Sequence, residues 1–163
     1  SFDSESQKRS KSSSTKICST NEISLSLPNR PNYICNTLES NVLSRISIEY
    51  WDGPTSDSGG NLTLLGAEKF TSQRDFDRIK VIDEDFNLVN SNYSISGTTG
   101  LYYEGKPERL GSSGEDNKRL VIPSELMFVY ISALSNPIGY GVDNSLRDTL
   151  KTEVNSILDS LSF

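Results

Sequence analysis

The apolar residues of this chain follow two different periods, and this change of period constrains the fold more than any other feature. From residue 42 to residue 51 apolar and polar residues alternate, which is the period of a β-strand with one buried side. From residue 145 onward the apolar residues recur every three to four positions, as in a single stripe along an α-helix: Leu146, Leu150, Val154, Ile157, Leu158 and Leu161. The sequence therefore predicts an α+β domain, with an amphipathic C-terminal helix packed on a mainly antiparallel sheet.

Several shorter runs with a strand-like pattern accompany the alternating run. Within 42–51, one side is expected in the core and the other, which ends in Trp51, is expected to be partly exposed; the core side holds Val42, Ser44, Ile46, Ile48 and Tyr50. The other runs cover residues 23–27, 61–66, 78–82, 86–89, 93–97, 100–104, 118–122 and 126–134. Many short strands at close spacing favour an antiparallel sheet of about six to eight strands.

The first sixteen residues differ in composition from the rest of the chain. They hold seven serines and carry four basic against two acidic residues, a local charge of +2. A segment with so few apolar residues cannot bury enough surface to offset the entropy lost on ordering. We therefore expect a flexible Ser/Lys-rich arm at 1–16 and a single α+β domain at 17–163, with order beginning near Glu22.

The charge of the body excludes some classes of partner. The whole chain carries a formal charge of −6, so the residues after the arm carry about −8. Sequence-independent binding of nucleic acid requires a basic surface that neutralises phosphates, and an acidic body argues against it. Since no apolar run approaches the roughly 18 to 20 residues that span a bilayer, the chain is also not expected to cross a membrane.

Two cysteines, Cys18 and Cys35, lie within polar, turn-rich sequence. A disulfide between them would close a loop that contributes about 3 kcal/mol of stability in the chain-entropy interpretation. The alternative is a pair of buried free thiols. Because the polar surroundings favour the disulfide, we expect an oxidising, extracytoplasmic location such as the exterior, the periplasm or an organelle lumen. Glycosylation sequons begin at Asn61 and Asn92, and the pattern leaves open whether either is used.

The residue types leave little room for catalysis. The chain has no histidine, which excludes catalytic triads and histidine-ligated metals, and it contains no nucleotide-binding glycine motif. The carboxylates at 75–77 and 83–85 have spacings typical of solvated turns rather than of a calcium loop. We therefore expect no catalytic residue, no metal site and no cofactor.

Aromatic and acidic residues next to a long polar loop are the best candidates for partner contact. The loops at 52–60 and 105–117 are expected to carry function, because loops on a rigid scaffold often do. For Trp51 itself, burial between sheet and helix is the favoured interpretation, and a surface role in partner contact is the alternative. The candidate partner-binding residues are Trp51, Asp52, Asp57, Tyr102 and Tyr103.

These absences favour a non-enzymatic extracytoplasmic binding or accessory domain that acts through a protein–protein surface. Three alternatives stay open, and the last of them is an enzyme that uses carboxylates alone, as in the cleavage of glycosides. Small acidic domains can be inhibitors or immunity proteins that block an enzyme, since charge complementarity to a basic target speeds association. A sheet curled around an apolar pocket would instead make a small-ligand carrier.

A family resemblance points the same way. The early strand from Ile23 to Pro28, the late apolar strand from Phe128 to Ala133 and a terminal helix that runs into the segment 157–163 together resemble the PsbP-like α/β/α sandwich family. Such domains commonly end in a helix followed by a Ser-Leu/Phe-x-Phe-like signature. The resemblance implies a small non-enzymatic accessory domain in a lumenal or periplasmic space.

Overall fold

The computed structural model describes residues 15–51, 61–79, 84–110, 117–132 and 144–163. Within these ranges the chain forms a seven-stranded antiparallel sheet, a separate two-stranded hairpin and one long helix near the C-terminus. The predicted class, a mainly antiparallel sheet with a C-terminal helix, is confirmed at this level. The elements are β1 (Thr15–Ser19), β2 (Ser24–Pro28), β3 (Tyr33–Glu39), β4 (Leu43–Trp51), β5 (Asn61–Phe70), α2 (Gln73–Asp77), β6 (Phe86–Ile95), β7 (Thr98–Gly105), α3 (Pro107–Leu110), β8 (Asn117–Ile122), β9 (Met127–Ser132) and α4 (Asn144–Asp159).

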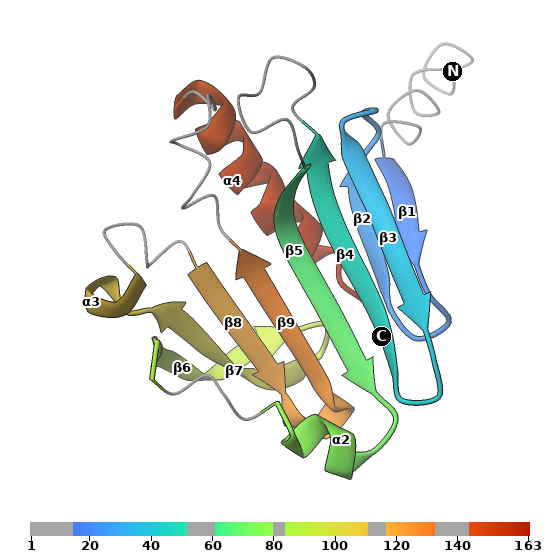
Figure 1. The fold of residues 1–163 in the computed structure, drawn as a ribbon, viewed down its shortest axis with the longest axis vertical. Coiled ribbons are helices and arrows are strands. Elements are labelled where there is room, and N and C mark those ends of the chain that lie inside the picture. The colour runs from blue at the N-terminus through green and yellow to red at the C-terminus, as the bar shows by residue number, and fades with distance from the viewer. Residues whose placement is uncertain (1–14, 52–60, 80–83, 111–116, 133–143) are drawn as a thin grey trace, which may run out of the picture.

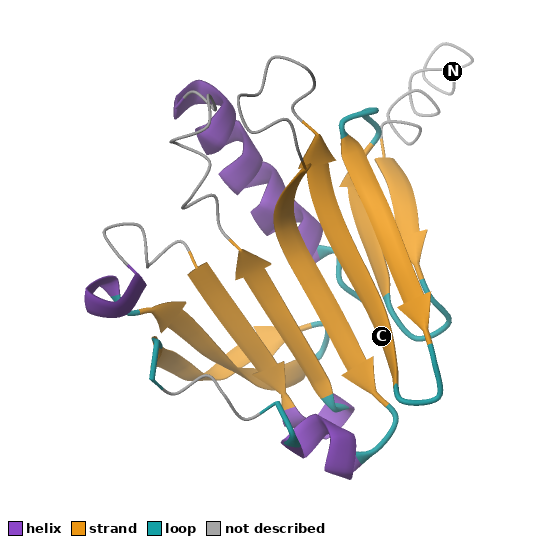
Figure 2. Ribbon diagram, in the orientation of Figure 1, coloured by secondary structure: helices purple, strands orange, loops and turns teal. Residues whose placement is uncertain are grey.

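The sheet has the strand order β3-β4-β5-β9-β8-β7-β6. Figure 1 shows α4 on one side of this sheet, where it lies behind the strands, with the β1–β2 hairpin beside β3 at one end (Figure 1). Figure 2 shows how far strands exceed helices in the described part (Figure 2). The helix contacts β2 and β5, and its apolar residues Leu150, Val154 and Ile157 are buried.

Alternation along β4 sets the two faces of the sheet. Ile46, Ile48 and Tyr50 are buried while the residues between them are half-buried, which confirms the predicted alternation, although Val42 precedes the strand and is exposed. The buried row continues across the sheet, where Ile46 pairs with Ala67 and the following strands add further apolar side chains. The main core therefore lies on the face that α4 occupies.

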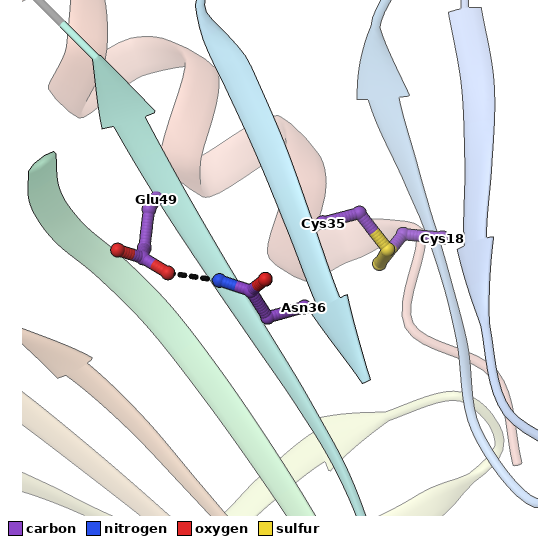
Figure 3. The surroundings of a disulfide bond; sticks show 4 residues. All are labelled: Cys18, Cys35, Asn36 and Glu49. Carbon is purple, nitrogen blue, oxygen red and sulfur yellow. Dashed lines mark hydrogen bonds between the residues drawn. A yellow bond between two sulfur atoms is a disulfide. The ribbon is translucent and has the colours of Figure 1, made fainter. Parts of the chain in front are cut away.

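A disulfide fastens the hairpin to the sheet. Cys18 in β1 is bonded to Cys35 in β3, with the two Cα atoms 5.8 Å apart, as Figure 3 shows (Figure 3). The predicted disulfide is confirmed, and such a bond is compatible with an oxidising compartment. At the other end of the chain, Ser24 in β2 pairs with Ser162, so the residues after α4 extend the hairpin.

Some predicted boundaries are wrong. The predicted strand at 78–82 does not begin as a strand, because the last turn of α2 extends to Arg78. The N-terminus of this helix is capped by the Ser72 hydroxyl. Residues 80–82 lie outside the described residues. β1 and β3 are strands that the sequence pattern did not indicate. Conversely, the runs at 86–89 and 93–97 belong largely to one strand, β6, whose pairing with β7 shifts register twice.

In the ranges that the structure describes, no helix has the length and apolar character needed to cross a membrane. Residues 1–14 of the predicted arm lie outside the described residues. The expected beginning of order near Glu22 is wrong, because β1 already spans Thr15–Ser19.

Candidate functional site

The face of the seven-stranded sheet opposite α4 is called the open face here, because no described segment lies across it in Figure 1 (Figure 1). Strand pairing aligns one residue from each of the seven strands in a single row across this face. In spatial order the row consists of Asn36, Ser47, Gly66, Tyr130, Arg119, Tyr103 and Leu88. The row places aromatic, cationic and small polar residues side by side on a rigid scaffold.

Tyr130 lies flat on the sheet at the centre of the row. A Cβ atom placed on Gly66, its cross-strand partner, would lie only 2.0 Å from the Tyr130 Cζ atom and 2.4 Å from Cε1. The ring therefore rests directly on the backbone of β5, and only glycine leaves room for it. The phenol extends to β4, where it is hydrogen-bonded with Ser47. Burial raises the pKa of the Tyr130 hydroxyl, and the nearby Glu68 carboxylate raises it further.

A hollow of about 400 Å³ borders this ring on the side of β3, β4 and β5. An ion pair lies on one wall, where the Arg45 Nε atom is 2.8 Å from a Glu68 carboxylate oxygen. On β3, the Asn36 amide donates a hydrogen bond to Glu49 and points away from Cys35, as Figure 3 shows (Figure 3). The hollow is lined by Asn36, Thr37, Leu38, Arg45, Ser47, Glu68 and Tyr130.

Arg119 follows Tyr130 in the row, and aromatic rings and backbone carbonyls hold its guanidinium in place. Its guanidinium carbon lies 4.5 Å from the centre of the Phe86 ring and 5.8 Å from that of Tyr130. Its Nη1 atom donates to the carbonyl oxygens of Lys118, at 2.9 Å, and Ile131, at 3.3 Å. Burial lowers the pKa of this guanidinium, although the side chain stays a cation because its reference pKa is so high. Aromatic rings over a partly desolvated cation stabilise this arrangement.

The structure brings two of the sequence-predicted residues to the open face. Tyr103 lies in the row between Arg119 and Leu88. Trp51 ends β4 on the same side of that strand as Glu49. The favoured interpretation of burial between sheet and helix is wrong, because the side chain is 46% exposed. Two hydrogen bonds tie its backbone to Asn32: the Trp51 amide donates to the Asn32 carbonyl, and the Asn32 side chain donates to the Trp51 carbonyl.

The remaining sequence-predicted residues are not on this surface or cannot be placed. Tyr102 points to the opposite side of β7, where its ring stacks on Tyr93 with the centroids 5.0 Å apart. Burial raises the pKa of its hydroxyl, which donates a hydrogen bond to Glu104. Asp52 and Asp57 lie outside the described residues.

The acidic turns have structural partners. Asp85 accepts a hydrogen bond from the Arg109 Nε atom at 3.0 Å, and Asp75 lies beside the helix cap at Ser72. In the described part of the chain, no group of three or more acidic or cysteine side chains is placed to hold a metal ion.

Sequence reasoning missed the hollow and its aromatic wall. The alternation along 42–51 does place Arg45 and Ser47 on the partly exposed side, which is a usable signal. Tyr130 lies within an apolar run, and nothing in that run shows that its ring rests on Gly66. That contact depends on the register between β5 and β9.

Chemically, the open face offers aromatic surface together with fixed hydrogen-bond donors and acceptors, a combination that suits binding.

Comparison of the chain with models of protein families, with curated proteins and with solved structures finds no significant match.

Proposed function

We propose that this chain is a non-enzymatic extracytoplasmic binding or accessory domain that contacts a partner protein through its open face. One observation carries the proposal: the row of side chains that crosses all seven strands on the face opposite α4. Tyrosine and arginine are the residue types enriched at the centres of protein interfaces, and this row contains Tyr103, Arg119 and Tyr130.

The rigidity of this surface supports the proposal. Tyr130 rests on Gly66, and Arg119 is held by Phe86 and by backbone carbonyls. Side chains that are already fixed lose little conformational entropy when a partner binds, which favours affinity. Trp51 and Leu88 are exposed and extend the surface toward two of its margins.

The location is supported by the disulfide, because bonds of this kind persist mainly outside the cytoplasm. The proposal also takes α4 as an amphipathic helix packed on the opposite face, which is supported by the burial of Leu150, Val154 and Ile157. Kinship with the PsbP-like domains is part of the same proposal. It is supported by the terminal helix that runs into the pairing of Ser162 with Ser24, whereas among the described residues no long helix covers the open face as in an α/β/α sandwich.

An inhibitor or immunity protein is the alternative that the acidic charge of −6 favours. Both functions use a protein surface, and the identity of the partner separates them: an enzyme whose activity falls on binding identifies an inhibitor. An accessory domain would leave the partner's activity unchanged or raise it.

The test is capture of a partner from the extracytoplasmic fraction of the source, with the full chain as bait. A photo-reactive residue at Leu88 or Tyr103 should cross-link the partner, and the same residue at Thr152 on the exposed side of α4 should not. Tyr103→Asp should abolish capture while Thr152→Asp retains it. Equal capture by both variants, with no cross-link from the open face, would overturn the proposal.

A further inference from the structure

We infer that the hollow beside Tyr130 is a binding subsite for a neutral saccharide unit. This inference uses the same open face as the proposed function, but it concerns a small polar ligand and does not require the protein partner to exist.

The first argument is the orientation of the aromatic ring. One face of the Tyr130 ring is pressed against Gly66, and the ring also lines the hollow. The π-face of an aromatic ring carries partial negative charge, so it attracts the polarised C–H groups on the flat side of a pyranose ring. A ring fixed flat on a sheet is therefore a ready platform for a sugar.

The second argument is the balance of charge. Among the seven residues that line the hollow, Arg45 is the only cation and Glu68 the only anion, and the two are paired at 2.8 Å. Next to the hollow, the Glu49 carboxylate that accepts from Asn36 is balanced by the Arg119 guanidinium near Tyr130, so the local net charge stays zero and gives no electrostatic advantage to an anionic or a cationic ligand. The ion pair still presents donors and acceptors together, as sugar hydroxyls require.

The third argument is the density of fixed polar groups. Asn36 and Ser47, which are paired across β3 and β4 on the open face, contribute an amide and a hydroxyl to the same hollow. Each sugar hydroxyl both donates and accepts hydrogen bonds. A wall of amide, hydroxyl, guanidinium and carboxylate groups therefore suits a sugar better than an apolar ligand. At about 400 Å³, the hollow falls in the lower part of the range for small-ligand sites, roughly 300–1,000 Å³.

The saccharide can come from a free polysaccharide or from a glycan on a partner protein. The experiment is an NMR titration of the full chain, with its disulfide intact, against neutral oligosaccharides derived from glucan, mannan, galactan and chitin. Charged oligosaccharides derived from pectin and chitosan serve as comparators. We expect at least one neutral oligosaccharide to shift the backbone amides of Asn36, Ser47, Gly66 and Tyr130, while amides on α4 stay unchanged.

Matched variants connect this binding to the ring. Tyr130→Ala should weaken binding about ten-fold, whereas Tyr130→Phe should retain most of it because the ring stays in place. Ile17→Ala removes an exposed apolar side chain on β1, outside the hollow and outside the row, and should bind as the wild type does. A dispersed amide spectrum for each variant shows that it is folded, and Tyr130→Phe tests the same site if Tyr130→Ala unfolds.

A charge variant tests the second argument independently. Glu68→Gln leaves Arg45 without its carboxylate, so the hollow gains one positive charge, and the preference should move from neutral toward anionic oligosaccharides. No shift with any neutral oligosaccharide would overturn the inference, as would equal binding of charged ones by the wild type or unchanged affinity in Tyr130→Ala.

Protein capture separates the two sources and the two proposals. If enzymatic removal of glycans from the extract abolishes capture of the partner protein, the sugar belongs to a glycan on that partner. If the chain binds free oligosaccharides and capture does not depend on glycans, the ligand is a free polysaccharide. Capture through the open face without any saccharide binding rejects only the subsite. Saccharide binding without capture rejects only the proposed function.

Discussion

Substitution of Gly66 by alanine tests whether the Tyr130 ring is held by the backbone beneath it. The added methyl group would lie 2.0 Å from Cζ and 2.3 Å from the hydroxyl oxygen of Tyr130, so the ring must swing away from the sheet. The far end of a tyrosine can move, and the cost is therefore the loss of its contacts rather than a clash in a rigid core.

The expected magnitude follows from those contacts. Exposing about 50 Å² of apolar ring surface costs about 1.2 kcal/mol at 25 cal/mol per Å². Loss of the hydrogen bond with Ser47 costs about 1 kcal/mol more. Alanine in a strand is more favourable than glycine by about 0.5–1 kcal/mol, which offsets part of this. We therefore expect Gly66→Ala to lower the free energy of unfolding by about 1–2 kcal/mol.

A double-mutant cycle with Tyr130→Ala isolates this effect, measured by urea unfolding of the disulfide-intact protein. In the Tyr130→Ala background the methyl group meets no ring, so Gly66→Ala should be neutral or stabilising by about 0.5–1 kcal/mol. The coupling energy should then be about 2 kcal/mol. A coupling near zero, or equal destabilisation in both backgrounds, would refute the contact between ring and glycine.

Three further predictions concern the disulfide, the buried residues of α4 and the buried tyrosines. Replacing Cys18 and Cys35 together by serine should lower the free energy of unfolding by about 3 kcal/mol, because the bond closes a loop between β1 and β3; a loss near zero in urea unfolding would contradict this role. Leu150→Ala should cost about 2–5 kcal/mol because its side chain is fully buried, while the exposed control Thr152→Ala should stay within about 0.5 kcal/mol; similar effects for both would show that α4 does not bury this stripe. Burial raises the pKa of the hydroxyls of Tyr33, Tyr93, Tyr102 and Tyr130, and because these stay protonated in the folded state and ionise near pH 10 in the unfolded chain, stability should fall as the pH rises above about 10. Absorbance at 295 nm should show only part of the seven tyrosines ionising before the chain unfolds, and ionisation of all seven near pH 10 in the folded state would contradict the burial.

The elements with a strong period could be predicted from the sequence, and the polar edge elements could not. The alternation at 42–51 and the stripe that begins near residue 145 coincide with β4 and α4, and the apolar positions of both patterns include buried residues. β1 and β3 were missed because they lie at sheet margins and are largely polar, so little apolar alternation marks them. β6 was read as two runs, since its two register shifts interrupt the alternation.

The candidate site shows the same limit. The alternation correctly places Trp51 on the partly exposed side of its strand. Because Tyr102 and Tyr103 are adjacent in a strand, the alternation predicts that they face opposite sides of the sheet. It does not predict which of the two faces the helix. The contact of Tyr130 with Gly66 joins two strands that are distant in sequence, and only the register between β5 and β9 reveals it.

The proposed contact of a partner protein with the open face can be measured residue by residue. Hydroxyl-radical footprinting of the full chain, alone and with the captured partner, measures this directly because it reports side-chain accessibility at each residue. We expect protection of Trp51, Leu88 and Tyr103, with unchanged oxidation of Ile17 on β1. Protection at Ile17 and along α4, with Leu88 and Tyr103 as reactive as in the free chain, would contradict it.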